Sequence, residues 1–464
     1  MSSSSISISK LRTDVGGRVI GPEDPEYDEA RSVFYGGIDR RPSVIVRVKD
    51  DMDVSRVVSL ARETGVELAV RSGGHSIPGH SVTDGGIVID LADLRALDFD
   101  VEGRTVWAQT GLSAGEFSTA ANAYGLGVGF GDTGSVGIGG ITLGGGIGYL
   151  ARKHGLTIDD LLAADVVTAD GEIRRADAET EPDLFWAIRG GGGNFGVATR
   201  FRFRLHELDM VVGGMLMLPA TVDTIAGFMA ESEASPEELG TIANVMKAPP
   251  LPFVPEEAHG KLVIMALMAF AGPTDAGQRV LAPFRALAEP VADMLRPMPY
   301  PEVYPPEQEG YHPVAITRTM FVDHIGRAEA ETILEHLETS TAMPGRGPVG
   351  GGVAQLRTLG GAMARVPVDA TAFAHRTSPI MVNVVAIFEG PDESEVHGPW
   401  VDAFAGALHQ GDDGAYVNFL GDEGEERVRA AYPGATWDRL RQIKARYDPT
   451  NLFRLNQNIP PAAA

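Results

Sequence analysis

The chain has 464 residues, 44% of them hydrophobic, which is enough for two domains with buried cores. Its formal net charge is −24 and no Lys/Arg-rich run is visible, so a nucleic-acid partner is not expected. The absence of cysteine excludes disulfides, thiolate metal sites and cysteine nucleophiles. The first residues lack a basic segment followed by an apolar core, and the weakly polar stretch 135–151 is too glycine-rich to span a membrane. We therefore expect a soluble, cytoplasmic protein without a membrane partner.

Residues 42–205 alternate short apolar runs with segments of helical periodicity. A helix is expected at 54–64, ending at Gly65, and strands are expected at 43–48, 68–71, 86–90, 105–109 and 197–205. Ser113 and Glu116 have the spacing of a capping box, which predicts a helix start. The pair Asp170-Gly171 between two strand-like runs predicts a hairpin.

The pattern changes after about residue 206. Prolines crowd 249–255 and 297–306, and the long apolar runs 262–270 and 380–388 predict strands of a broader sheet. We therefore divide the chain into residues 1–205, a second domain at 206–410, and a segment at 411–464 that returns to the first domain.

Two glycine-rich segments are the most informative part of the sequence. The first, Arg71-Ser72-Gly73-Gly74-His75-Ser76, directly follows a short strand, and the second is the run GDTGSVGIGGITLGGGIG at 131–148. Glycine allows backbone N–H groups to converge on an anion such as a pyrophosphate. A single histidine lies inside the first segment, and the second offers bare backbone on which a flat ring system could lie.

Taken with four further motifs, these segments resemble the berberine-bridge-enzyme-like oxidases of the vanillyl-alcohol oxidase superfamily. The motifs are DLFWAIRGGGGNFGV at 183–197, ATAFAHR at 370–376, YVNF at 416–419 and YDPTNLFRLNQNI at 447–459. The resemblance implies an α+β, two-domain, PCMH-type FAD-binding fold. Residues 1–205 would bind FAD, with the PCMH-type part at about 38–208. Residues 206–410 would form the substrate domain on an antiparallel sheet flanked by helices, and a berberine-bridge-like motif would lie at about 415–460.

The resemblance also implies flavin contacts. FAD would be attached covalently through His75, and through no second residue, because Thr133 stands where many relatives carry a flavin-linking cysteine. The small Val136 matches a position that favours oxidases, and Ile141 replaces a histidine of some relatives. The remaining implied contacts are Arg71, Ser72, Gly73, Gly74, Ser76, Gly137, Gly140, Gly146, Asn194, Gly196, Val197, Asn456 and Asn458.

The implied reaction is hydride transfer to flavin N5 from a C–H of an alcohol, a carbohydrate or a secondary metabolite. Dioxygen would then reoxidise the flavin and give hydrogen peroxide. Two alternatives stay open: an amine oxidase like the bacterial hydroxynicotine oxidases, and a flavin-binding protein without turnover.

The catalytic base is the least defined part of the site. Relatives often have Tyr-x-Asn-Tyr where this chain has Tyr416-Val-Asn418-Phe419, and Phe419 cannot take a proton. Tyr416 is therefore the candidate base, on a segment expected to be a strand with Asn418 on the same face. Asn383 lies near the position of a cavity Gln or Glu of relatives and is the second candidate.

Three other motif readings fail on context. The G-x-G-x-x-G at 191–196 follows an expected helix and precedes a strand, the reverse of a dinucleotide-binding site. The G-x-S-x-G at 111–115 could mark a hydrolase nucleophile, but Ser113 is already explained as a helix cap. His75 and His80 lack the spacing and the third ligand of a zinc site.

Overall fold

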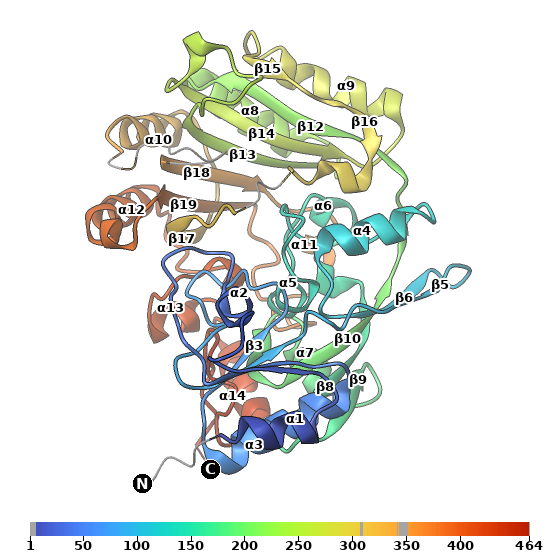
Figure 1. Ribbon diagram of the computed structural model, residues 1–464. Helices are drawn as coiled ribbons and strands as arrows, with labels where there is room; N and C mark the ends of the chain where they lie inside the picture. The colour runs from blue at the N-terminus through green and yellow to red at the C-terminus, as the bar shows by residue number, and fades with distance from the viewer. Residues whose placement is uncertain (1–5, 307–309, 341, 343–350, 464) are drawn as a thin grey trace.

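The structure is a computed structural model that describes residues 6–306, 310–340, 342 and 351–463. A broad sheet with helices on its outer side forms one half of the molecule, and the described part of the other half contains three smaller sheets, one of which has only two strands (Figure 1). No helix in these described ranges has the length and apolar character needed to cross a membrane.

The N-terminal sheet has the strand order β1-β2-β4-β3, and its strands β2, β3 and β4 are parallel. Helix α3 is capped at its start by Asp50, whose side chain accepts a hydrogen bond from the N–H of Asp53. Its C-cap is Gly65, with φ +68°, where the sequence predicts the helix to end. The elements are α1 (Ile8–Asp14), β1 (Arg18–Ile20), α2 (Tyr27–Arg31), β2 (Val44–Arg47), α3 (Asp51–Thr64), β3 (Leu68–Arg71) and β4 (Ile87–Asp90).

The second sheet is antiparallel, with the order β5-β6-β10-β8-β9. The predicted hairpin is confirmed as β8 and β9, and Gly171 takes φ +85° in the turn. The predicted capping box is confirmed at α4, where Ser113 and Glu116 bond each other's backbone N–H. The elements are β5 (Leu97–Asp100), β6 (Thr105–Gln109), α4 (Ala114–Asn122), β7 (Leu126–Gly127), α5 (Ile138–Gly144), α6 (Ala151–His154), η1 (Thr157–Asp159), β8 (Leu161–Val167), β9 (Ile173–Asp177), α7 (Pro182–Ala187), η2 (Gly192–Asn194), β10 (Val197–Arg204) and β11 (His206–Glu207).

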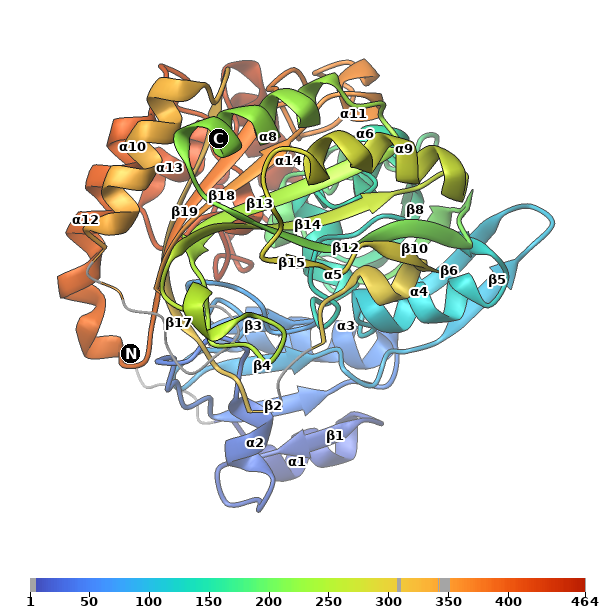
Figure 2. The same ribbon diagram turned by 90° about the horizontal axis from the view of Figure 1, so that it is seen from above.

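The broad sheet is antiparallel, with the order β15-β12-β14-β13-β18-β19-β17 and β16 beside β12. Helices α8, α9, α10 and α12 cover its outer face, and the other face is turned to the rest of the molecule (Figures 1 and 2). The apolar runs at 262–270 and 380–388 form β14 and β19, as predicted. The elements are β12 (Met210–Pro219), α8 (Val222–Ala234), β13 (Leu239–Lys247), η3 (Glu256–Ala258), β14 (Leu262–Phe270), α9 (Thr274–Arg285), β15 (Ala292–Asp293), β16 (Arg296–Pro299), η4 (Tyr300–Val303), β17 (Val314–Val322), α10 (Arg327–Glu338), β18 (Gly351–Thr358), α11 (Ala362–Arg365), β19 (Ile380–Phe388), η5 (Pro391–Glu393) and α12 (Ser394–Leu408).

The C-terminal segment packs against the first half of the chain through α14 and α7, and contains η6 (Val417–Phe419), α13 (Glu425–Ala430) and α14 (Ala435–Tyr447). The fully buried Lys444 donates from Nζ to Asp448 Oδ2 (2.7 Å) and to the backbone carbonyls of Asn194 (2.7 Å) and Phe453 (2.9 Å). One ammonium group therefore ties the C-terminal segment to the turn that contains Asn194.

The expectation of a strand at YVNF is wrong. The segment forms the 3₁₀ helix η6, with the N–H of Phe419 donating to the carbonyl of Tyr416 at 2.9 Å. The physical reason is that the Tyr416 hydroxyl is bonded to the backbone of the second glycine run, at Gly146 (3.0 Å) and Ile147 (3.2 Å). These contacts turn the chain inward, whereas a strand would need a neighbouring strand to pair with.

Candidate functional site

A cavity of about 520 Å³ lies where the two glycine-rich segments, strands β17–β19 and the C-terminal segment meet. Elements that are far apart in the sequence therefore build one site. Among the residues that the sequence predicts for the site, those that line the cavity are Ser72, Gly73, Gly74, His75, Ser76, Thr133, Val136, Gly137, Gly140, Asn194, Gly196, Val197, Asn383, Tyr416 and Asn456.

Three of the predicted residues lie behind the cavity wall. Arg71 is buried and donates to Asp90 Oδ2 at 2.8 Å, so it holds the carboxyl ends of β3 and β4 together. Burial alone would raise the pKa of Asp90, but Arg71 and Arg47 lower it. Gly146 donates its N–H to Tyr416. Asn458 follows the cavity residues of the C-terminal segment.

The two glycine segments pack backbone against backbone. A Cβ on Gly73 would lie 2.2 Å from the backbone N of Gly137, so neither position has room for a side chain. Ser72 reinforces the contact, because its Oγ donates to the carbonyl of Thr110 (2.6 Å) and accepts from the N–H of Gly139 (3.2 Å).

The first segment presents backbone donors to the cavity. Within the described part of the chain, the N–H groups of Gly73, Gly74 and Ser76 donate to no other residue. Gly74 adopts φ +74°, a conformation that a side chain rarely takes and that turns successive N–H groups to one side. The segment can therefore bind an anionic group through its backbone.

The imidazole of His75 is fixed on two sides within this cradle. Its Nε2 lies 2.9 Å from Ser135 Oγ on the second glycine segment. Its ring stacks on Phe34, with centroids 4.0 Å apart and an interplanar angle of 19°. These contacts hold the ring against the cavity.

Buried acceptors without partners lie at the C-terminal side of the cavity. The side-chain oxygens of Asn456 and Asn458 are buried and have no hydrogen-bond partner among the described residues. An unsatisfied buried acceptor is costly in a folded protein unless a ligand supplies the missing donor. The neighbouring Asn194 is satisfied, because its amide bonds the backbone of Gln457 (3.1 Å) and Ile459 (2.9 Å).

Tyr416 is 2% exposed, and three donors point at its hydroxyl oxygen. They are the N–H groups of Gly146 and Ile147 and the amide of Asn418, at 3.0, 3.2 and 2.9 Å. Burial raises the pKa of Tyr416, and the three hydrogen bonds offset part of this rise. The surroundings therefore favour a neutral phenol at neutral pH while being able to stabilise its anion.

Sequence reasoning missed the charged pair of the cavity, Asp132 and Arg357. Arg357 Nη2 donates to Asp132 Oδ2 at 2.5 Å, and Gln355 Oε1 accepts from the same guanidinium at 2.8 and 3.0 Å. The available signal was Gln355 and Arg357 at alternate positions of an otherwise apolar strand, which places both side chains on one face.

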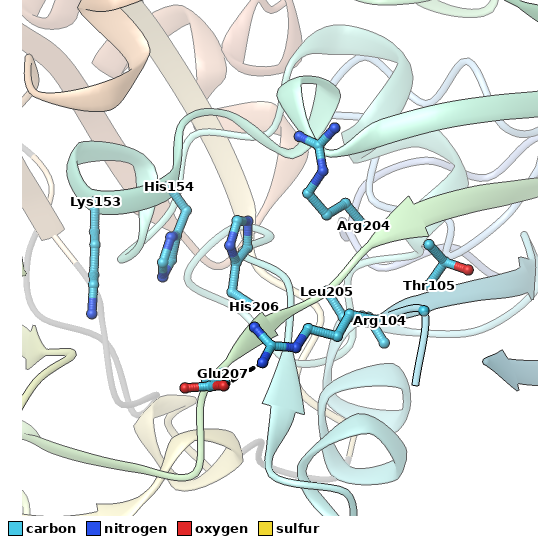
Figure 3. Close-up of a pocket in the computed structure, with 9 residues that line it drawn as sticks. Arg104, Thr105, Lys153, His154, Arg204, Leu205, His206 and Glu207 are labelled. Atoms are coloured by element: carbon cyan, nitrogen blue, oxygen red, sulfur yellow. Dashed lines mark hydrogen bonds and ion pairs between the residues drawn. The ribbon is translucent and has the colours of Figure 1, made fainter. Parts of the chain in front are cut away.

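A second hollow, of about 530 Å³, shares no lining residue with the cavity. It lies beside α6 and β11 and gathers basic side chains, including Lys153, His154 and His206 (Figure 3). Two of its basic side chains already have acidic partners: His206 Nε2 bonds Asp160 at 2.7 Å, and Arg104 pairs with Glu207 at 2.6 Å. We assign it no part in the site, and no group of three potential metal ligands occurs in the described residues.

Comparisons with known proteins agree with the geometry. A family model described as "FAD binding domain" matches residues 42–177, and one described as "Berberine and berberine like" matches residues 415–460. An FAD-linked oxidoreductase of Bacillus subtilis is 33% identical, with 97% of this chain and 99% of the relative covered. The (R)-6-hydroxynicotine oxidase of Paenarthrobacter nicotinovorans is 30% identical, with 98% and 99% covered.

A solved structure shows the same architecture. The 6-hydroxy-D-nicotine oxidase of Arthrobacter nicotinovorans superposes with a TM-score of 0.84 at 27% identity, covering 97% of this chain and 98% of that chain. The fold is therefore the expected α+β, PCMH-type fold with an antiparallel substrate sheet. The chain belongs to the berberine-bridge-enzyme-like family of FAD-linked oxidoreductases.

Proposed function

We propose that this FAD-dependent oxidase holds its flavin through a single covalent bond to His75 and oxidises a small hydroxyl-bearing molecule. The observation that carries the proposal is His75 itself, fixed by Ser135 and Phe34 inside a cradle of backbone donors. Thr133 lines the same cavity and has no sulfur with which to form a second link.

The residues of the cavity fit FAD. The N–H groups of the Gly73–Ser76 turn suit a pyrophosphate, and Gly140, where a Cβ would meet no atom within 4 Å, leaves room for a flat ring. The orphaned oxygen of Asn456, which lines the cavity, suits a ring N–H donor. Bound FAD supplies the hydride acceptor, which dioxygen reoxidises with release of hydrogen peroxide.

Ser135 prepares His75 for attachment. When Ser135 Oγ accepts a hydrogen bond from Nε2–H, the neutral imidazole carries its lone pair on Nδ1, which is the nucleophilic nitrogen. The stack on Phe34 restricts rotation of the ring. Ser135 would thus set the tautomer and Phe34 the direction of attack.

In the oxidation step, Tyr416 takes the proton of the substrate hydroxyl and Asn383 positions the substrate. The three donors at the Tyr416 oxygen stabilise the anion that is needed for proton removal. The carbonyl of the Asn383 amide accepts from the Thr317 hydroxyl, which fixes the amide on the cavity face of β19.

Acid precipitation and peptide mapping test the covalent bond. Yellow colour should stay with the precipitated protein and map to the peptide that contains His75. His75→Gln should release the colour into the supernatant, and His80→Gln, which changes another histidine of the cavity wall, should retain it. Wild-type protein that releases all its colour would refute the bond.

A peroxide-release screen over alcohols, sugars and amines tests the reaction. The relative named as a hydroxynicotine oxidase makes an amine substrate the second candidate, and Phe419 favours it because a neutral amine can lose hydride without a base. If amines alone reduce the flavin, the protein is an amine oxidase. If no compound bleaches the flavin, the protein binds FAD without turnover.

A further inference from the structure

A row of polar side chains crosses the cavity-facing side of the broad sheet. Asn244 on β13 lies opposite Gln355 on β18, and Gln355 lies opposite Asn383 on β19. Their neighbours along these strands are mostly valine, alanine and isoleucine. Buried polar groups need partners, and this row provides them: Gln355 Nε2 donates to Asn244 Oδ1 at 3.0 Å, and Asn244 Nδ2 donates to the carbonyl of Met265 at 3.2 Å.

The row holds Arg357 in one position. Gln355 Oε1 accepts from Nε and Nη2, Asp132 Oδ2 accepts from Nη2, and the carbonyl of Ile147 accepts from Nη1 at 3.4 Å. The guanidinium carbon lies 5.0 Å from the ring centroid of Phe419. Arg357 is 3% exposed, so the pair with Asp132 joins the second glycine segment to the substrate sheet inside the cavity wall.

The opposite charges of this pair cancel each other. Asp132 is the one carboxylate and Arg357 the one lysine or arginine among the described lining residues. Burial lowers the pKa of His80 to about 4, so its imidazole is neutral at pH 7. A substrate ammonium group would therefore find no carboxylate of the described wall that is not already paired with Arg357.

The hydrogen-bonding groups that remain point to an oxygen ligand. The Asn383 carbonyl is occupied by Thr317, whereas its Nδ2 donates to no described residue. Arg357 uses four of its five N–H donors in the hydrogen bonds given above, which leaves one on Nη1. Two donors on neighbouring strands suit a hydroxyl, ether or carbonyl oxygen, which accepts hydrogen bonds, and repel an ammonium, which only donates.

We propose that the Asp132–Arg357 pair determines substrate class, admitting neutral oxygen-bearing molecules and excluding cationic amines. Arg357 neutralises Asp132, the one carboxylate of the described cavity wall, and with Asn383 it donates to a substrate oxygen. The inference rests on the proposed function, because it assumes that the substrate occupies this cavity. It deepens that function by choosing between its alcohol and amine alternatives.

The test is a binding titration on the flavin-loaded enzyme, followed by the change in flavin absorbance and therefore independent of turnover. The probes are benzyl alcohol, benzylamine and benzoate at pH 7, which present the same ring with a neutral, a cationic and an anionic group. Wild type should bind the alcohol at least tenfold more tightly than the amine. Arg357→Met leaves Asp132 unpaired and should lower the Kd of the amine at least tenfold. Asp132→Asn leaves Arg357 unpaired and should lower the Kd of benzoate at least tenfold.

The double variant Asp132→Asn/Arg357→Met carries neither charge. It should therefore bind neither benzylamine nor benzoate more tightly than the wild type does. Arg318→Met is the matched control, since Arg318 is on β17 but pairs with Asp402 (2.8 Å) outside the cavity lining. If Arg357→Met does not fold, the benzoate result for Asp132→Asn decides. The inference would be overturned if the wild type bound benzyl alcohol and benzylamine with equal Kd. It would also be overturned if the ratios of the Kd values of the probes were the same in the variants as in the wild type. If selective binding persists but no substrate reduces the flavin, the proposed oxidase reaction fails and the inference stands.

Discussion

The backbones of Gly73 and Gly137 are in direct contact, and a Cβ on either residue would lie 2.2 Å from the backbone nitrogen of the other. Gly137→Ala must therefore separate the two glycine segments. We expect a loss of stability of about 1–3 kcal/mol, as for overpacking, together with less flavin per protein. Denaturant unfolding and the ratio of flavin to protein absorbance measure the two effects. Gly406→Ala, on helix α12 where a Cβ meets no atom within 4 Å, should reduce neither quantity.

Val136 lines the cavity two residues before α5, and its size is expected to set oxygen access. Val136→Leu adds one methylene to this wall. Reoxidation of the reduced flavin by dioxygen should slow, whereas anaerobic reduction by substrate should change little. Stopped-flow measurements of the two half-reactions separate the effects. Wild-type protein that is reoxidised by quinones or dyes but not by dioxygen would contradict the assignment.

Tyr416→Phe tests the proposed base. Because burial raises the pKa of Tyr416, its anion forms on the alkaline side, and the rate of flavin reduction by an alcohol should rise with pH. The variant should lower this rate at least ~100-fold and remove the rise. Rapid-mixing reduction across pH, with an unchanged flavin spectrum, is the measurement.

Tyr432→Phe is the control for losing a buried hydroxyl, since Tyr432 bonds the carbonyl of Gly190 (3.2 Å) and does not line the cavity. In this control, the flavin should be reduced by substrate at the wild-type rate. A Tyr416 variant that also reduces at the wild-type rate would show that another group takes the proton or that none is needed.

Lys444 is expected to be essential for stability because its ammonium has three oxygen partners and no exposed surface. Lys444→Met leaves Asp448 as an unpaired buried carboxylate, which costs about 3–5 kcal/mol when a buried pair is broken. Denaturant unfolding should show this loss. Lys261→Met, on the surface, should stay within about 0.5 kcal/mol of wild type.

His154 makes stability depend on pH. Burial, together with the neighbouring His206 and Lys153, lowers its pKa to about 3 from the ordinary 6.5. Between these values the unfolded chain binds a proton that the folded chain does not, so the free energy of unfolding falls as pH falls from 6.5 towards 3.

His154→Phe should weaken this dependence while keeping the stack on His206, whose ring lies 3.8 Å away (Figure 3). Denaturant unfolding at pH 7 and pH 5 gives the change in the free energy of unfolding with pH for the variant and for the wild type. An equal slope in the variant and the wild type would show that other groups, such as His80, carry the effect.

Local sequence patterns predicted those elements whose causes are local. The capping box at Ser113 and the hairpin turn at Gly171 depend on residues a few positions apart, and β14 and β19 follow from long apolar runs. The 3₁₀ turn after Tyr416 could not be predicted, because it depends on hydrogen bonds to the distant Gly146 and Ile147.

The site shows the same division. The glycine segments could be predicted to bind an anion through backbone N–H groups, because the conformational freedom of glycine is a local property of the sequence. The pairing of Asp132 with Arg357 joins residues 225 positions apart, and neither residue carries a local pattern that names its partner. Arg71, read as a cavity residue from its motif, instead bonds Asp90 because the parallel register of β3 and β4 places the two side by side.

The bond from Lys444 to the carbonyl of Asn194 has a consequence for synthesis. Asn194 leaves the ribosome some 250 residues before its partner, so the flavin cradle emerges early but lacks its closing contacts while the whole substrate sheet is being made. Newly made chains therefore pass through a stage in which the strands of the first two sheets have been synthesised but Lys444 has not. The complete cavity exists only after the C-terminal segment, with Tyr416 and Asn456, has been made.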